Sequence, residues 1–222
     1  MFVTVSGPIG VGKSTTTKIL SQILDYTPFL ETVSDHPYLE GLYRDPHNYA
    51  FKAQVFFLRD RFEKHMLYHN STHNIVADRS IYEDIIFAQI LYNMGYMETA
   101  DFLETYLPHF ELLVSMLPPP DLMICLKAGL DTLMFRIAKR GRDMEKNMDR
   151  HYMELLQEKY DAWIEQYPYP KLIVETEGLD LTCDLSPDWS YLIENILKSA
   201  KGVNFNSDAL QAIKKLTPSH AS

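Results

Sequence analysis

Short apolar runs alternate along the chain with longer segments in which hydrophobic residues recur at helical spacing. The runs that we predict to be strands cover residues 2–5, 28–30, 75–77, 122–126 and 172–174. Each is apolar nearly throughout, which is typical of strands covered on both faces. Helical spacing begins around residues 19–24 and covers residues 49–69, 81–93, 99–117, 131–139, 150–166 and 188–198, with a bend expected at Pro108.

This alternation predicts an α/β fold in which a five-stranded parallel sheet carries helices on both faces. The length of 222 residues fits one hydrophobic core. We therefore expect a single domain over residues 1–200. The polar segment 201–222 is expected to form a tail, either with a short helix over residues 207–216 or disordered.

Composition narrows the setting. The two cysteines, Cys125 in an apolar run and Cys183 in a polar segment, are too few for a disulfide framework and favour a reducing compartment. No apolar run approaches the ~18 residues that a membrane span needs, and the start of the chain lacks a basic leader. We expect a soluble cytoplasmic protein with no membrane partner. The net charge of −9 argues against a nucleic-acid partner.

Basic residues are nevertheless concentrated in one segment. Seven of the 21 Lys and Arg residues are Lys127, Arg136, Lys139, Arg140, Arg142, Lys146 and Arg150. In an acidic protein this concentration indicates a local site for small, highly charged phosphates. A solvated helix face is the alternative.

Residues 7–14 match the pattern G-x-x-x-x-G-K-[ST] directly after a predicted strand and at the start of a predicted helix. Glycines at these positions let backbone N–H groups converge on phosphates at a helix N-terminus. The residues expected around the phosphates are Gly7, Gly10, Val11, Gly12, Lys13, Ser14 and Thr15. We expect Lys13 to reach the β- and γ-phosphates and the Ser14 hydroxyl to coordinate Mg²⁺.

A phosphate-binding loop indicates a nucleoside triphosphate without specifying the reaction. The guanine-reading motif Asn/Thr-Lys-x-Asp is absent, which disfavours a GTPase. A small-molecule kinase, a nucleoside monophosphate kinase such as thymidylate kinase, and a non-catalytic nucleotide-binding subunit remain as alternatives.

Three further stretches bear on the acceptor. Asp78 and Arg79 follow the predicted strand 75–77, and Glu31 follows the predicted strand 28–30. Ligands of open α/β sheets bind at the carboxyl edge where these side chains emerge. Residues 136–145 form a basic helix end that runs through a glycine into an arginine, as suits a lid over phosphates.

Together these motifs resemble the deoxyribonucleoside kinase family, which includes deoxycytidine, deoxyguanosine and bacterial deoxyadenosine kinases. The resemblance covers residues 1–198 in order: phosphate-binding loop, strand-end Glu, Leu-x-x-x-Tyr with a downstream Gln, Asp-Arg-Ser and an Arg-Gly-Arg lid. It implies a P-loop kinase fold with an arginine-rich lid at about residues 136–148. It also implies phosphorylation of a deoxynucleoside 5′-hydroxyl by ATP with Mg²⁺, in nucleotide salvage, by a homodimer.

The resemblance further implies roles for the reacting groups. Glu31 matches the base that takes the 5′-hydroxyl proton, Arg79 neutralises charge nearby, and Asp78 holds Mg²⁺ through the metal's shell. The lid arginines that close on the triphosphate match Arg136, Arg140 and Arg142. Asp180 is expected beside the adenine of ATP.

Sugar and base contacts follow in the same way. Tyr43 and Glu145 match the pair that binds the 3′-hydroxyl, Gln54 matches the amide that reads the base edge, and Phe87 matches the stacking aromatic. Arg61 and Asp84 match a charged pair beneath the base that purine and cytosine kinases carry and thymidine-accepting members lack. The sequence departs from the family where Thr32 follows Glu31 and His36 occupies the approximate position of an aromatic residue.

Several assignments have simpler alternatives. Glu31 is otherwise an exposed loop acid, Asp78 a helix cap, and Arg61 with Asp84 a structural ion pair. A neutral hydroxyl needs a base whereas an ionised phosphate does not, so the strand-end Glu31 favours a nucleoside over a monophosphate acceptor.

Overall fold

The computed structural model describes residues 1–31, 36–146, 148–181 and 188–199. Residues 197–199 are described without their side chains. The tail predicted over residues 201–222, with its helix over 207–216, lies outside the described residues. So do Thr32 and Cys183.

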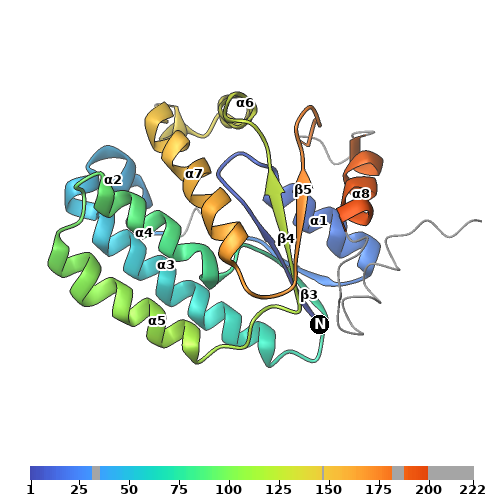
Figure 1. Ribbon diagram of the computed structural model, residues 1–222, viewed down its shortest axis with the longest axis horizontal. Helices are drawn as coiled ribbons and strands as arrows, with labels where there is room; N and C mark the ends of the chain where they lie inside the picture. Colours follow the sequence, from blue (N-terminus) through green and yellow to red (C-terminus); the bar gives the residue numbers. More distant parts are fainter. Residues whose placement is uncertain (32–35, 147, 182–187, 200–222) are drawn as a thin grey trace, which may run out of the picture.

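A parallel sheet forms the centre of the protein, as predicted (Figure 1). Its strands are β1 (Phe2–Ser6), β2 (Thr27–Phe29), β3 (Ile75–Asp78), β4 (Leu122–Lys127) and β5 (Lys171–Glu175), in the spatial order β2-β3-β1-β4-β5. β1 lies between β3 and β4, with Val3 opposite Val76 and Leu122. β3 and β2 lie on one side of β1, and β4 and β5 lie on the other, so the chain connections change direction across the sheet beside β1. Open α/β sheets place their ligand crevice at such a point.

Helices cover both faces of the sheet, which confirms the predicted fold class (Figure 1). They are α1 (Lys13–Leu24), α2 (Leu39–Arg44), α3 (Pro46–His69), α4 (Asp84–Asn93), α5 (Leu107–Ser115), α6 (Leu130–Arg140), α7 (Arg150–Gln166) and α8 (Asp188–Ser199). In Figure 1, α1 and α8 lie on one side of the strands and α3, α4, α5 and α7 on the other. None of the described helices combines the length and apolar composition needed to cross a bilayer.

Burial differs among the strands, and the expectation that all five are covered on both faces is wrong for two of them. β1 and β3 are buried throughout and β4 at all but its last residue, whereas β2 is exposed along its length and β5 alternates between buried and exposed residues. β2 and β5 are the edge strands. Their apolar sequences alone do not distinguish an edge from a centre.

The helical segment predicted over residues 99–117 also changes type within its length. Residues Ala100–Tyr106 form a π-helix (η2), and α5 continues from Leu107 with Pro108 in its first turn. A proline in the first turn of an α-helix forfeits no intrahelical hydrogen bond, so the change of helix type accommodates Pro108. The short helix α2, which carries Tyr43, was not predicted.

The carboxyl edge of the sheet collects the motifs that the sequence singles out. β1 leads into the phosphate-binding loop, β3 ends at Asp78, and the 3₁₀ turn η1 (Ile81–Glu83) follows it. A second 3₁₀ turn, η3 (Asp143–Glu145), follows the end of α6. The fold thus brings segments from most of the chain to one edge.

Candidate active site

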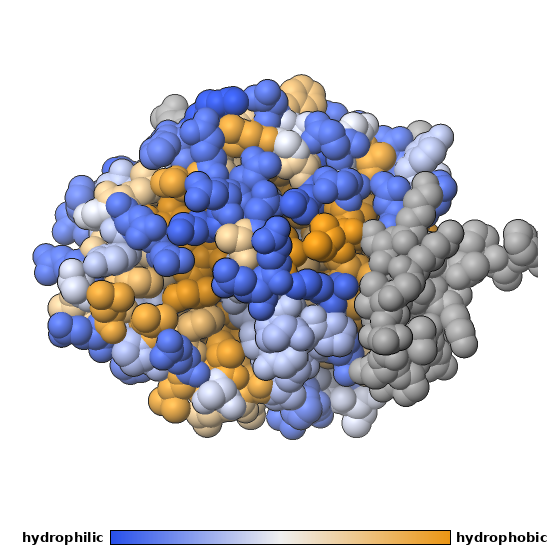
Figure 2. Space-filling model, in the orientation of Figure 1, coloured by the Kyte–Doolittle hydropathy of each residue, from blue (hydrophilic) through white to orange (hydrophobic). Residues whose placement is uncertain are grey.

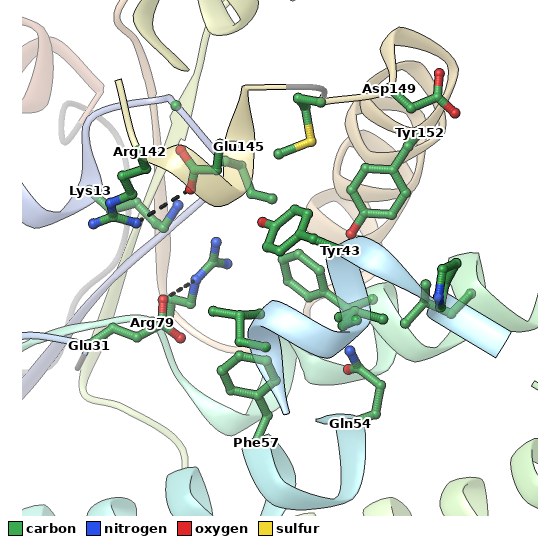
Figure 3. A pocket seen from close by; sticks show the side chains of 18 of the residues that line it. Lys13, Glu31, Tyr43, Gln54, Phe57, Arg79, Arg142, Glu145, Asp149 and Tyr152 are labelled. Atoms are coloured by element: carbon green, nitrogen blue, oxygen red, sulfur yellow. Dashed lines mark hydrogen bonds and ion pairs between the residues drawn. The ribbon is translucent and has the colours of Figure 1, made fainter. Parts of the chain in front are cut away.

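A cavity of about 230 Å³ opens at this edge between the phosphate-binding loop, α2, α3, α4 and α7. The predicted residues that line it are Gly10, Lys13, Ser14, Glu31, Tyr43, Gln54, Arg61, Asp78, Arg79, Phe87, Arg140, Arg142 and Glu145. Figure 3 shows a charged end around Lys13, Arg142 and Glu145, with Tyr43 between that end and Gln54. The cavity therefore joins a phosphate-sized charged site to a more apolar compartment.

The phosphate-binding loop adopts the conformation that its glycines permit. Gly7 has φ +142°, and a Cβ there would lie 2.6 Å from the Leu126 carbonyl oxygen, so only glycine fits. Lys13 opens α1, and its Nζ donates a hydrogen bond to the Pro8 carbonyl at 2.8 Å. Burial, reinforced by the nearby Arg79, lowers the pKa of Lys13 to about 7.

Ser14 and Asp78 form the part of the site suited to a metal ion. The Ser14 hydroxyl donates to Asp78 Oδ2 at 2.5 Å, while Asp78 Oδ1 is buried without a hydrogen-bond partner among the described residues. Burial raises the pKa of Asp78 despite the nearby Lys13. Within the described part of the chain no three His, Cys, Asp or Glu side chains group into a metal cage. A hydroxyl and one carboxylate fit Mg²⁺, which keeps waters and takes its other ligands from phosphates.

Glu31 lies between two guanidinium groups. Arg79 Nε donates to Glu31 Oε2 at 3.1 Å, and Arg61 Nη2 donates to Glu31 Oε1. Burial alone would raise the pKa of Glu31, but Arg61 and Arg79 outweigh it and lower the pKa to about 2. Glu31 is therefore ionised at neutral pH and held from both sides, unlike an exposed loop acid.

The apolar compartment carries one buried amide. Gln54, from α3, is 2% exposed and lines the cavity, and its Oε1 has no hydrogen-bond partner among the described residues. Phe87 lies on another wall, with the Arg79 guanidinium 4.8 Å from its ring centroid. An amide and an aromatic ring are the groups that suit the edge and the face of a nucleobase.

Asp84 lies behind this compartment and does not line it. Arg61 Nη1 donates to Asp84 Oδ1, and Asp84 is fully buried. Burial raises the pKa of Asp84 to about 7, although Arg61 opposes the shift. Arg61 does line the cavity, so Asp84 can influence the cavity through its ion pair with Arg61.

The lid segment places two of its three predicted arginines at the cavity. Arg140 donates to Glu145 Oε2 at 3.1 Å from Nε and 2.5 Å from Nη2, and Arg142 Nη1 donates to Oε1 at 3.4 Å. Tyr43 lines the cavity with them, and burial together with the Glu145 charge raises the pKa of Tyr43 to about 12. The predicted sugar-binding pair and the lid arginines thus form one cluster.

Arg136 differs from its expected role as a lid arginine that closes on phosphates. It lies on the buried face of α6, where it donates to the carbonyls of Val11 (3.2 Å), Thr176 (2.6 Å) and Leu179 (2.7 Å). Four residues later on the same helix, Arg140 is exposed enough to reach the cavity. The structure thus makes Arg136 a link between the phosphate-binding loop and residues 176–179.

Asp180 also lies away from the cavity. Its carboxylate forms an ion pair with Lys139 at 3.2 Å, and both side chains are about half exposed. Residues 182–187, which follow it, lie outside the described residues. The expected contact of Asp180 with adenine stays a prediction.

Sequence reasoning missed the apolar walls of the cavity, which are Ile9, Leu39, Leu42, Pro46, Phe57, Leu91, Met94, Tyr96, Met148 and Tyr152, as well as Asp149 at its rim. Phe57 is prominent, because the Arg61 guanidinium lies 4.6 Å from its ring centroid. Its position one helical turn after Gln54 and one before Arg61 was the available signal. His36, at the position where the family has an aromatic residue, packs on Phe57 at 4.0 Å between ring centroids.

Comparison with known proteins agrees with the family resemblance of the sequence. A family model described as "Deoxynucleoside kinase" matches residues 3–196. The chain belongs to the deoxynucleoside kinase family.

Named relatives are similar over nearly their whole length. A deoxyadenosine/deoxycytidine kinase of Bacillus subtilis is 38% identical over 205 residues, covering 90% of this chain and 92% of the relative. A deoxyguanosine kinase of Lactobacillus acidophilus is 37% identical over 216 residues, covering 90% and 91%. The structure of a deoxyadenosine kinase from M. mycoides with dCMP and dCDP superposes with a TM-score of 0.77 at 32% identity, covering 90% of this chain and all of that one.

Membership confirms the fold and the reaction class that the sequence predicts. The chain is a kinase that transfers a phosphoryl group to the hydroxyl of a deoxynucleoside. A second M. mycoides structure, with bound dATP, has a TM-score of 0.74 at 32% identity.

The lowered pKa of Lys13 predicts that binding of a triphosphate takes up a proton. With a pKa of about 7, free Lys13 is mostly neutral at pH 8, and the phosphate anions favour its charged form. Affinity for MgATP should therefore fall as the pH rises above 7. Calorimetry at pH 8 in buffers of different ionisation enthalpy should report uptake of roughly one proton.

Lys13→Met is the control and should show weaker binding without uptake. Heats at pH 8 that do not depend on the buffer would contradict the assignment.

Proposed function

We propose that this kinase phosphorylates the 5′-hydroxyl of deoxyadenosine, deoxyguanosine or deoxycytidine in preference to thymidine, with ATP as donor, in cytoplasmic nucleotide salvage. The observation that carries the proposal is the placement of Glu31. Its carboxylate lines the same cavity as Lys13 of the phosphate-binding loop and as the amide of Gln54. A nucleoside with its base at Gln54 then presents its 5′-hydroxyl toward Glu31.

In this proposal Glu31 orients the 5′-hydroxyl and accepts its proton as the bond to phosphorus forms. A carboxylate with a pKa of about 2 is a weak base, which suits a loose phosphoryl transition state in which the nucleophile keeps its proton until late. Positioning then contributes more than basicity. Arg79, hydrogen-bonded to Glu31 at 3.1 Å, adds positive charge beside the transferred group.

Ser14 and Asp78 would hold Mg²⁺, which would neutralise charge on the β- and γ-phosphates. Asp78 Oδ1, which has no hydrogen-bond partner among the described residues, supports this role. Arg140 and Arg142 would exchange contacts with Glu145 for contacts with phosphate, since guanidinium groups bind phosphate oxygens bidentately.

Preference for adenine, guanine or cytosine rests on the Arg61–Asp84 pair and on the names of the relatives. The Bacillus subtilis relative is named for deoxyadenosine and deoxycytidine, and the Lactobacillus acidophilus relative for deoxyguanosine. The buried ion pair with Asp84 fixes Arg61 at the wall of the cavity, where its guanidinium would act on the edge of a bound base.

Purified protein, MgATP and a panel of deoxynucleosides and their monophosphates test the function by chromatography. We expect 5′-monophosphates from dA, dG or dC, no product when EDTA replaces Mg²⁺, and no phosphorylation of monophosphates. Glu31→Gln should lower kcat at least ~100-fold with little change in nucleoside KM, because it removes the group that orients the hydroxyl. Glu40→Gln, an exposed carboxylate on α2, is the matched control.

Activity only on monophosphates would replace the proposal by a nucleoside monophosphate kinase. Triphosphate binding without turnover on any acceptor would indicate a non-catalytic subunit. A near-normal kcat in Glu31→Gln would remove Glu31 from the mechanism.

Removing Arg61 and Asp84 together should relax base selectivity. Either single change strands the other charge in a buried site, whereas Arg61→Met with Asp84→Ala removes both. We expect kcat/KM for thymidine relative to dA and dC to rise at least ~10-fold. The ratio is the readout, because Arg61 also binds Glu31 and overall activity will fall.

The exposed pair Arg59 and Glu63 on the same helix offers the control double alanine variant, which should keep the wild-type ratio. An unchanged ratio in the Arg61 and Asp84 variant would mean that this pair is structural.

A homodimer is the proposed assembly. Exposed apolar side chains lie on α3 and on the neighbouring η2 and α5, and Figure 2 shows apolar surface on this side of the molecule. They include Val55, Met66, Leu67, Leu103, Leu112 and Met116, which we call the α3–α5 surface. The side chains of Leu67, Leu112 and Met116 are each more than half exposed. Apolar surface that is grouped in this way is typical of a protein–protein interface.

Light scattering coupled to size-exclusion chromatography should therefore give twice the chain mass. Leu67→Glu with Leu112→Glu should yield monomers, because burying two carboxylates in an apolar interface is unfavourable. Tyr191→Glu, at an exposed position on α8, should leave the dimer intact. A monomeric wild-type protein, or a dimer that survives both glutamates, contradicts this assembly.

A further inference from the structure

Glu83 is a fully buried carboxylate that joins the end of β1, the segment after β3 and α7. It ends the 3₁₀ turn η1 and is 0% exposed. Its Oε1 accepts from the Ser80 backbone N–H at 3.0 Å. Its Oε2 accepts from the Ser6 hydroxyl at 2.9 Å, from Arg79 Nη1 at 3.2 Å and from the Tyr160 hydroxyl. A buried charge is retained only where such partners compensate for lost hydration.

Arg79 is the residue that these contacts constrain most. Its backbone is left-handed, with φ +72°, a strained conformation for a residue with a side chain. Nη1 donates to the Tyr160 hydroxyl at 2.7 Å in addition to Glu83. Nε donates to Glu31 at 3.1 Å. Two of the three guanidinium nitrogens are thus fixed, and their directions set the third.

The third nitrogen, Nη2, has no hydrogen-bond partner among the described residues, and Arg79 lines the cavity. In the planar guanidinium, Nη2 shares one edge with the Nε–H that binds Glu31 and the other edge with Nη1, so its hydrogens lie between Glu31 and the groups that Nη1 binds. In Figure 3 the Arg79 guanidinium extends from its bond with Glu31 toward the region of Lys13. That region is where the transferred phosphoryl group would lie under the proposed function.

We infer that Glu83 and Tyr160 are positioning residues, which hold Arg79 so that one guanidinium serves both the acceptor base Glu31 and the transferred phosphoryl group. Neither Glu83 nor Tyr160 lines the cavity, so neither touches substrate. Through Ser6, Glu83 also ties this arrangement to the end of β1, where the phosphate-binding loop begins. The inference rests on the proposed function of the site.

Tyr160→Phe is the cleanest test, because it removes one hydroxyl and keeps the buried ring. We expect kcat to fall about 10- to 100-fold, as misplacement of a transition-state contact does, while KM for nucleoside and for ATP stays within about threefold. Tyr167→Phe is the matched control. Tyr160 lies on α7, and Tyr167 directly follows the last residue of that helix. The Tyr167 hydroxyl is buried and has no hydrogen-bond partner among the described residues, so its removal should leave kcat at the wild-type value.

A double-mutant cycle separates positioning from general structural support. In an Arg79→Lys background, Tyr160→Phe should cause little further loss, since its effect passes through the guanidinium. Glu83→Gln, which keeps the shape and loses the charge, should likewise lower kcat more than it changes either KM. Assays well below the melting temperature of every variant remove unfolding as a cause.

A readout independent of turnover is the NMR signal of the Arg79 Nε–H group, assigned by its loss in Arg79→Lys. It should shift or broaden in Tyr160→Phe and stay unchanged in Tyr167→Phe. An active wild-type enzyme with an unchanged kcat and an unchanged Arg79 signal in Tyr160→Phe would falsify the inference and leave the proposed function standing. So would equal losses from Tyr160→Phe with and without Arg79. A wild-type enzyme inert toward every nucleoside counts against the proposed function instead.

Discussion

Buried carboxylates and guanidinium groups alternate at the carboxyl edge of the sheet, and the acceptor site depends on this pairing. Asp84 holds Arg61, which holds Glu31, which in turn is held by Arg79 and, beyond it, by Glu83. Each charge would be strongly unfavourable here by itself, and its neighbours offset at least part of that cost. This series of ion pairs extends from Asp84, behind the apolar compartment, to Glu83, beside the phosphate-binding loop. A shift at either end therefore disturbs the orientation of Glu31.

The same pairing explains how one protein supplies carboxyl groups of different acidity. Two guanidinium groups outweigh burial at Glu31 and lower its pKa to about 2, whereas burial prevails at Asp84 and raises its pKa to about 7. Nearby Glu83 and Glu31 add to the effect of burial at Asp84, whereas Arg61 and Arg79 together oppose it at Glu31. Glu31 is therefore ionised, as its proposed role as proton acceptor requires.

The sequence predicts the parts of this site that local patterns determine. The phosphate-binding loop and the strand-end positions of Glu31 and Asp78 follow from strand-turn-helix order, and all line one cavity. Phe57 and Tyr152 were missed because a helix pattern does not say which apolar face meets a ligand. Arg136 was assigned to the lid by its identity, but it lies one turn before the end of α6, where it binds backbone carbonyls of Val11, Thr176 and Leu179. Glu83 had a signal in the spacing Ser80-x-x-Glu83, typical of a capping box, but its partner Tyr160 is distant in sequence.

Opposite pKa shifts at Lys13 and Asp78 connect the fold to the donor. Burial lowers the pKa of Lys13 and raises that of Asp78, so the protein alone disfavours both charges. A triphosphate would stabilise the charged lysine, and a divalent cation would stabilise the ionised aspartate beside Ser14. Lys13 and Asp78 are thus both better suited to a bound metal–triphosphate complex than to the empty site. A triphosphate alone would leave Asp78 without a cation and a metal alone would leave Lys13 without an anion, so the two groups together suit the complex better than either component.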